Sequence, residues 1–144
     1  AAMPCGKLIV MQPITDLDIL LRQLSPALDP ERYAYAATRR SQALDALSPI
    51  AVFEEAEVLS VIAPLSRLED QGIEPVFICR RITLEVNSAL EAVGLTAAVS
   101  QALAGAGVSA NIVAALHHDH VFVPEDKAGE ALSVLKELSD RNGA

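Results

Sequence analysis

The sequence predicts an α+β fold of two ferredoxin-like units (βαββαβ), with antiparallel sheets whose helices pack on one face. Three observations support this prediction. The second half follows the order β-α-β-β-α, the first half repeats a rougher version with the same close strand pair in its middle, and the connections are short. We expect a degenerate N-terminal unit over residues 1–75 and a clearer C-terminal unit over residues 76–144.

The first half opens with a helix and ends with another. Thr15 can cap the first helix, acidic residues follow in its first turn, and leucines repeat at helical spacing on one face: Leu17, Leu20, Leu21 and Leu24. Prolines then end this helix, and residues 31–38 alternate like a strand. Residues 39–49 are expected to form a polar loop. Residues 51–63 are typical of a hairpin that turns at its Glu-Glu-Ala-Glu stretch, and a short helix should follow from Pro64 to Gly72.

The second half gives a clearer pattern. A strand is expected over residues 76–86, and a helix over residues 93–106 with Gly107 as its C-terminal stop. Two further strands, in ANIVAAL and HVFV, are joined by a turn at His-His-Asp. Pro124 opens the last helix, whose apolar face contains Ala128, Ala131, Leu132, Leu135 and Leu138.

Composition and charge exclude some partners. The chain is 51% hydrophobic but only 3% aromatic, without tryptophan, so the core is aliphatic and few side chains can stack on bases. The formal net charge of −8 repels nucleic acid. We interpret the basic pairs Arg39–Arg40 and Arg80–Arg81 as surface residues or ion-pair partners.

Cysteine content and hydropathy indicate a compartment. Cys5 and Cys79 form no CxxC motif, and two cysteines cannot build a secreted disulfide scaffold; Cys79 lies in the apolar run VFIC, as a buried free thiol would. No window approaches the roughly 18 uninterrupted apolar residues of a membrane span, and the first residues lack a signal-peptide core. We therefore expect a cytoplasmic protein that binds no membrane.

A resemblance to a known family rests on the second half. The run GLTAAVSQALAGAGVSANIV places glycines at Gly94 and Gly107, then Val108 and Asn111, as ACT domains do at their first helix and second strand. With NSALEAVGLTAA, HDHVFVP, LLRQLSP and IAVFEEAEVLSVIAP, the chain resembles small stand-alone bacterial tandem-ACT proteins. Those proteins are similar to the paired ACT modules of aspartate kinase and to the arginine-sensing ACT proteins of animals.

The resemblance implies amino-acid binding at an interface between ACT units, usually with dimerisation. Gly94 would let a carboxylate approach the helix N-terminus, where backbone N–H groups are free, and no Lys or Arg lies between Arg81 and Lys127. The expected ligand-binding residues are Asn87, Ser88, Val93, Gly94, Leu95 and Thr96. The alternatives are a tight turn at Gly94, loop closure by Asn87 and Ser88, and an exposed hydroxyl at Thr96. Asn87-Ser88-Ala89 departs from the His-Ser-Ser of the similar group, which leaves the ligand's identity open.

The motif His117-His118-Asp119-His120 offers a metal or acid-base reading. Alternation puts His118 and His120 on one face of a strand, but a catalytic zinc needs a third ligand, and the chain has no further histidine. We interpret the motif as a turn with a structural role, with Asp119 in the turn itself. We predict no metal and no cofactor.

The function predicted is that of a non-catalytic regulatory protein. No GxSxG elbow or GxxxxGK[ST] loop is present, and the paired carboxylates suit turns and helix starts. The chain should bind a small ligand, form a homo-oligomer, and act through another protein. One alternative is a structural or oligomerisation module that has lost its ligand, and another is a small metal-dependent enzyme built on the histidine motif.

Overall fold

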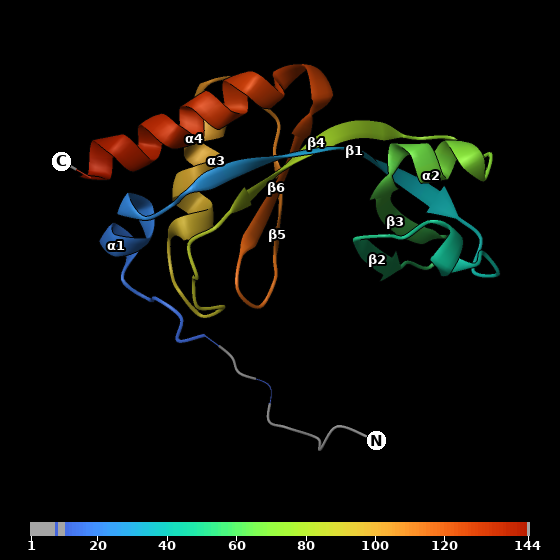
Figure 1. The fold of residues 1–144 in the computed structure, drawn as a ribbon, viewed down its shortest axis with the longest axis horizontal. Coiled ribbons are helices and arrows are strands. Elements are labelled where there is room, and N and C mark those ends of the chain that lie inside the picture. The colour runs from blue at the N-terminus through green and yellow to red at the C-terminus, as the bar shows by residue number, and fades with distance from the viewer. Residues whose placement is uncertain (1–7, 9–10, 144) are drawn as a thin grey trace.

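The computed structural model of the chain describes residue 8 and residues 11–143. The elements follow one another along the chain as in Figure 1: α1 (Leu17–Arg22), β1 (Pro26–Thr38), the 3-10 turn η1 (Leu44–Ala46), β2 (Ala51–Glu54), β3 (Leu59–Pro64), α2 (Leu65–Asp70), β4 (Phe77–Leu84), α3 (Leu95–Gly105), β5 (Asn111–Ala114), β6 (Asp119–Pro124), η2 (Glu125–Lys127) and α4 (Ala128–Gly143).

The six strands among the described residues join in one antiparallel sheet in the order β2-β3-β1-β4-β6-β5. The long strand β1 lies at its centre, with Tyr33 opposite Cys79 of β4 on one side and opposite Pro64 of β3 on the other. The predicted α+β class with antiparallel pairing is confirmed. The two units are fused edge to edge, because β1 and β4 pair directly.

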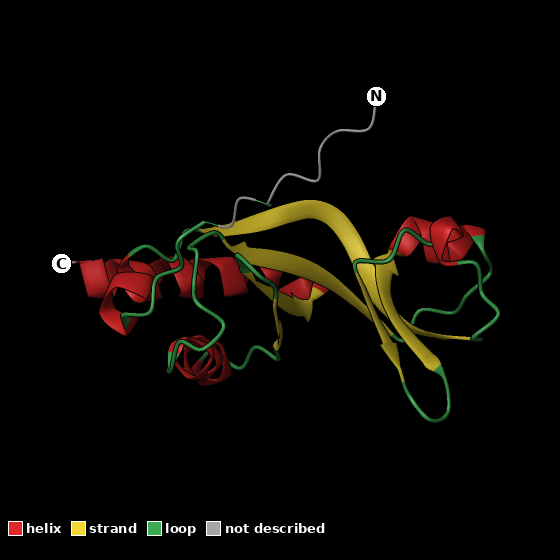
Figure 2. Cartoon of the chain, turned by 90° about the horizontal axis from the view of Figure 1, so that it is seen from below, coloured by secondary structure: helices red, strands yellow, loops and turns green. Residues whose placement is uncertain are grey.

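The helices pack on the face of the sheet that carries Ala34, Ile78, Ile82 and Val121. Figure 2 shows them in two groups at the two ends of the strands. One group, α1, α3 and α4, encloses the larger core with β4 and β6. The other end is covered by α2, whose buried Leu65 and Leu68 pack on Ala34. The opposite face of the sheet is lined by strand residues.

Helix α1 differs from its prediction in its cap and in its place. Asp16 caps it instead of Thr15, because the Asp16 Oδ1 atom accepts a hydrogen bond of 3.1 Å from the Ile19 N–H. Its buried Leu20 shares a core with Ile82 and Leu135. Packing therefore crosses the expected boundary at residue 75, and the division into two units at that residue stays a prediction.

Strand β1 begins at Pro26, five residues before the predicted start. Proline removes a backbone donor, which a strand tolerates where one side has no partner. Residues 26–28 pair with β4 alone, while pairing with β3 begins only at Tyr33. The prolines therefore lie where the missing donor breaks no ladder.

Two further predictions have an outcome in the core. Cys79 is a buried free thiol, as expected, and burial raises the pKa of this thiol to about 12. Cys5 lies outside the described residues. In the part of the chain that the structure describes, no helix has the length and apolarity needed to cross a bilayer.

Candidate functional site

The loop between β4 and α3, residues 85–94, lies at one end of the second unit (Figure 1). The segment before α1 runs beside it. The Ile14 N–H donates to the Asn87 carbonyl at 2.8 Å, and the Ala89 N–H donates to the Ile14 carbonyl at 2.9 Å. The Asn87 side-chain amide donates to the Gln12 carbonyl at 3.1 Å. These bonds fix the loop against the N-terminal segment.

A small hollow of about 50 Å³ lies behind this loop, between the start of α3 and the start of β6. A buried pair lies in its lining: the Ser88 hydroxyl donates to Asp119 Oδ2 at 3.1 Å, and Asp119 is only 7% exposed. The residues that line the hollow are Ser88, Ala89, Leu90, Ala92, Leu95, Thr96, Ala114 and Asp119.

The hollow is lined both by a helix N-terminus and by a carboxylate. A helix leaves its first backbone N–H groups without intrahelical partners, and its dipole is positive there. The N-cap residue of α3 is Gly94, which has no side chain that could accept a hydrogen bond from the N–H groups of Leu95 and Thr96. The Asp119 carboxylate also lines the hollow. The hollow therefore offers donors to an anion and an acceptor to a cation.

Gly94 has a packing role of its own. Its φ is +103°, and a Cβ atom built there would lie 2.9 Å from Leu17 Cδ2 of α1. A side chain at this position would be strained in its backbone and would press on α1. The tight-turn interpretation of Gly94 accounts for this geometry without a ligand.

The structure brings together three of the six expected ligand-binding residues, Ser88, Leu95 and Thr96. Asn87 instead holds the N-terminal segment, Gly94 packs on Leu17, and Val93 points outward with 84% of its surface exposed. That these six residues bind a ligand stays a prediction.

The prediction that Asp119 lies in the turn of the histidine motif is wrong. Asp119 is the first residue of β6, and it is buried. The alternation of the strand could have predicted this burial, because Asp119 lies two and four residues before the buried Val121 and Val123 and so points to the same face.

His120 faces the other side of the sheet from Asp119. Its Nδ1 atom lies 3.1 Å from the Thr83 hydroxyl, and burial, with the nearby Arg81 and His118, lowers its pKa. His118 Nδ1 lies 3.5 Å from the Val86 carbonyl oxygen. Within residues 11–143 no three His, Cys, Asp or Glu side chains are grouped as a metal site would need.

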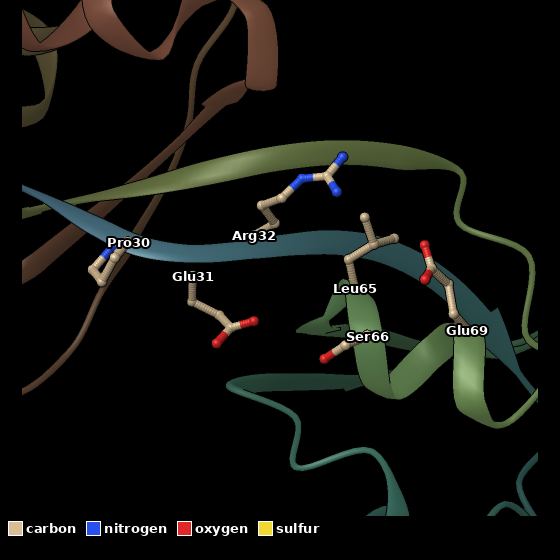
Figure 3. A pocket seen from close by; sticks show the side chains of 6 residues that line it. All are labelled: Pro30, Glu31, Arg32, Leu65, Ser66 and Glu69. Carbon is tan, nitrogen blue, oxygen red and sulfur yellow. The ribbon is translucent and has the colours of Figure 1, made fainter.

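A wider hollow of about 320 Å³ lies between β1 and α2, shown from close by in Figure 3. Two exposed carboxylates, Glu31 and Glu69, and the Ser66 side chain line it. Arg32 also lines this hollow and forms an ion pair with Glu125 of η2 through two hydrogen bonds. In one of them, Arg32 Nη2 donates to Glu125 Oε2 at 2.9 Å. This exposed pair links the first unit to the second.

Comparison with known proteins identifies the family. The ACT domain family matches residues 12–80 and, a second time, residues 76–137. The chain belongs to the ACT domain family. The two matches together span residues 12–137, so the chain is a tandem-ACT protein. ACT domains are generally regulatory modules that bind small molecules such as amino acids, and they often oligomerise.

Solved structures support the same assignment. A protein of unknown function from Vibrio cholerae, described as a possible transport protein, is 40% identical to this ACT protein, covers 85% of this chain and 95% of its own, and superposes with a TM-score of 0.75. The ligand-free regulatory subunit of aspartate kinase from Thermus thermophilus is 14% identical, with 81% and 97% covered and a TM-score of 0.60. Clostridium acetobutylicum aspartate kinase is 11% identical, with 81% and 34% covered and a TM-score of 0.61.

The two aspartate kinase structures share the fold with this ACT protein. No curated protein matches the chain.

Proposed function

We propose that this ACT protein is a non-catalytic regulator that binds an amino acid in the hollow between α3 and β6, and that a second copy of the chain closes the site. The observation that carries the proposal is the buried Asp119 carboxylate beside the open N-terminus of α3.

The charges of the hollow complement those of an amino acid. A carboxylate is stabilised by free backbone N–H groups at a helix N-terminus, here those of Leu95 and Thr96. An ammonium needs acceptors, and Asp119 accepts one bond from Ser88 while a carboxylate has about four acceptor positions. In a chain of net charge −8, these N–H groups replace the basic side chain that residues 82–126 do not supply.

The size of the hollow indicates that one chain supplies only part of the site. A volume of about 50 Å³ has room for the charged head of an amino acid and little more. Leu90 lines the hollow and is 62% exposed. Two further exposed apolar side chains are close in sequence to the lining residues: Val93 precedes Gly94, and Leu116 lies two residues beyond Ala114. A second copy on this rim would bury these side chains and enclose the ligand's own.

The runner-up is a structural or oligomerisation module without a ligand. The contact between Gly94 and Leu17 and the bond from Asn87 to Gln12 favour it, because both explain the loop by packing alone. Either function makes the output depend on another protein.

A thermal-shift screen of the twenty amino acids tests the proposal. A ligand at 100 times its Kd adds about 2.7 kcal/mol to the free energy of unfolding, which is a readily measured shift. Asp119→Asn keeps an acceptor for Ser88 but removes the charge, so it should lose the shift. Asp70→Asn, on the exposed end of α2, is the matched control and should keep it. No shift with any amino acid would favour the structural module.

A further inference from the structure

The face of the sheet opposite the helices carries an apolar cluster built from strand residues alone. Tyr33, Ile62, Cys79 and Phe122 are buried in it. The Tyr35 ring contacts two others, with centroid distances of 5.7 Å to Phe77 and 6.0 Å to Phe122. The aromatic residues of this chain are few, and the cluster gathers all but one of them on this face.

A cavity of about 120 Å³ opens on this face and is lined from both edges of the sheet. Ala51 belongs to β2 at one edge, and Val113 belongs to β5 at the other edge. The sheet must therefore curl until its two outer strands approach each other. The remaining lining residues are Ile50, Arg81, Ala115, His120 and Phe122.

The two polar side chains of the cavity, Arg81 and His120, both carry nitrogen atoms that can donate hydrogen bonds. Arg81 Nη2 donates to Asp29 Oδ2 at 2.6 Å, and the Arg81 guanidinium lies 5.2 Å from the centre of the Tyr33 ring. This network holds the guanidinium in place beside the cavity. His120 uses its Nδ1 atom toward Thr83, which leaves Nε2 for another partner.

We propose that this cavity is a second ligand site, which binds a short monocarboxylate with a compact apolar tail between the two ACT units. The tail would lie among Ala51, Val113 and Phe122, and the carboxylate would face Arg81 and His120. A cavity of about 150 Å³ lined by apolar side chains holds benzene. This cavity is smaller, so it would take a compact tail, such as the three-carbon tail of isobutyrate, with the carboxylate at its mouth.

Binding of an anion here should be coupled to protonation of His120. Of the groups that act on His120, Arg81 on β4 and His118 on the same hairpin carry or can take positive charge, and Asp119 on the other face is negative. The Asp29 carboxylate, which is paired with Arg81, offsets part of the positive charge. A bound carboxylate between Arg81 and His120 offsets the positive charge and raises the pKa of His120. By linkage, the carboxylate binds more tightly at low pH than at high pH.

The cavity is separate from the proposed amino-acid site. Asp119 and His120 are neighbours in β6, so their side chains point to opposite faces of the sheet. Loss of one site therefore leaves the other testable, and the readout below follows a side chain that the amino-acid site does not use.

The test is a titration of the full chain with isobutyrate, followed by NMR at the Cε1–H of His120, which is assigned by its loss in His120→Gln. Sodium chloride at equal ionic strength is the reference. Isobutyrate should shift this resonance and raise the pKa of His120, with an affinity several-fold higher at about pH 6 than at about pH 8, both of which keep isobutyrate ionised. Benzoate, which is larger, should not bind.

Two neighbouring substitutions separate the cavity from the strand that carries it. Ala51→Leu fills the cavity and should lower the affinity for isobutyrate at least about tenfold, because the apolar tail then loses the surface that it buries. The control is Val52→Leu, on the other face of β2, which should leave the affinity for isobutyrate unchanged. If Ala51→Leu does not fold, Ala115→Val fills the same cavity in its place. Equal shifts with chloride, or unchanged binding in the filled variants, would overturn the proposal.

Discussion

The Ser88 hydroxyl donates a hydrogen bond of 3.1 Å to the Asp119 carboxylate, and both residues are buried. The bond joins the loop before α3 to the first residue of β6. The same bond fixes the shape of the proposed amino-acid site.

Removal of the Ser88 hydroxyl should destabilise the fold. Ser88→Ala leaves the buried Asp119 carboxylate without this donor, and an unsatisfied buried group costs about 1–3 kcal/mol. Urea denaturation measures the change in the free energy of unfolding. Ser109→Ala, at an exposed position before β5, is the control and should stay within about 0.5 kcal/mol of the wild type. Equal stability of the two variants would contradict the importance of the bond.

A side chain at Gly94 should cost more than one at Gly107. Both residues have positive φ, +103° and +72°, but only Gly94 has a neighbour, Leu17, in the way of a Cβ atom. Gly94→Ala should lose about 1–3 kcal/mol from backbone strain alone, and the contact adds to this loss. Thermal unfolding of Gly94→Ala with and without Leu17→Ala measures the coupling. If the two changes simply add, the contact with α1 contributes nothing.

Asp29 should make stability fall in acid. Burial raises the pKa of its carboxyl, but bonds from the Glu31 N–H, Arg81 and Tyr33 outweigh burial and hold it below the ordinary 3.8. A depressed pKa means that the ionised form stabilises the fold above 3.8 and that this stability is lost as the pH falls toward the folded-state pKa. From about pH 5 to about pH 3 the wild type should lose more free energy of unfolding than Asp29→Asn. Parallel pH curves would show that the network does not act through charge.

Val93 should hold two copies together. It is 84% exposed beside the amino-acid site, so Val93→Glu puts a charge on the rim that a second copy would cover. Sedimentation at micromolar concentration should give a dimer for the wild type and a monomer for this variant. Val76→Glu, 77% exposed and away from the rim, is the matched control and should remain a dimer. A monomeric wild type would remove the second copy from the account.

The sequence predicts most helices and strands, but it predicts less well which of them pack against each other. The hairpin of β2 and β3 follows from alternation and a charged turn, and α4 follows from its apolar stripe. The leucines of α1 show that one of its faces is buried, but nothing in their spacing says that the face lies on Ile82 of β4. Such a choice between two cores depends on tertiary contacts.

The candidate site was predictable in part for the same reason. Gly94 and Thr96 mark the start of a helix, which local pattern finds. To predict that Asp119 is buried, the alternation of the strand has to be given more weight than the preference of aspartate for turns. The curl of the sheet that brings Ala51 and Val113 to one cavity follows from the twist of six strands. It therefore cannot be predicted from the sequence of any one strand.

The most direct test of the amino-acid site compares an amino acid with its des-amino analogue by titration calorimetry, using the amino acid that gives the largest thermal shift. If Asp119 holds the ammonium, the wild type should bind the analogue at least about tenfold more weakly, as the loss of a hydrogen bond to a charged group implies. Asp119→Asn should distinguish the two ligands far less. Equal affinity of the wild type for both ligands, or the same discrimination in Asp119→Asn, would contradict the account.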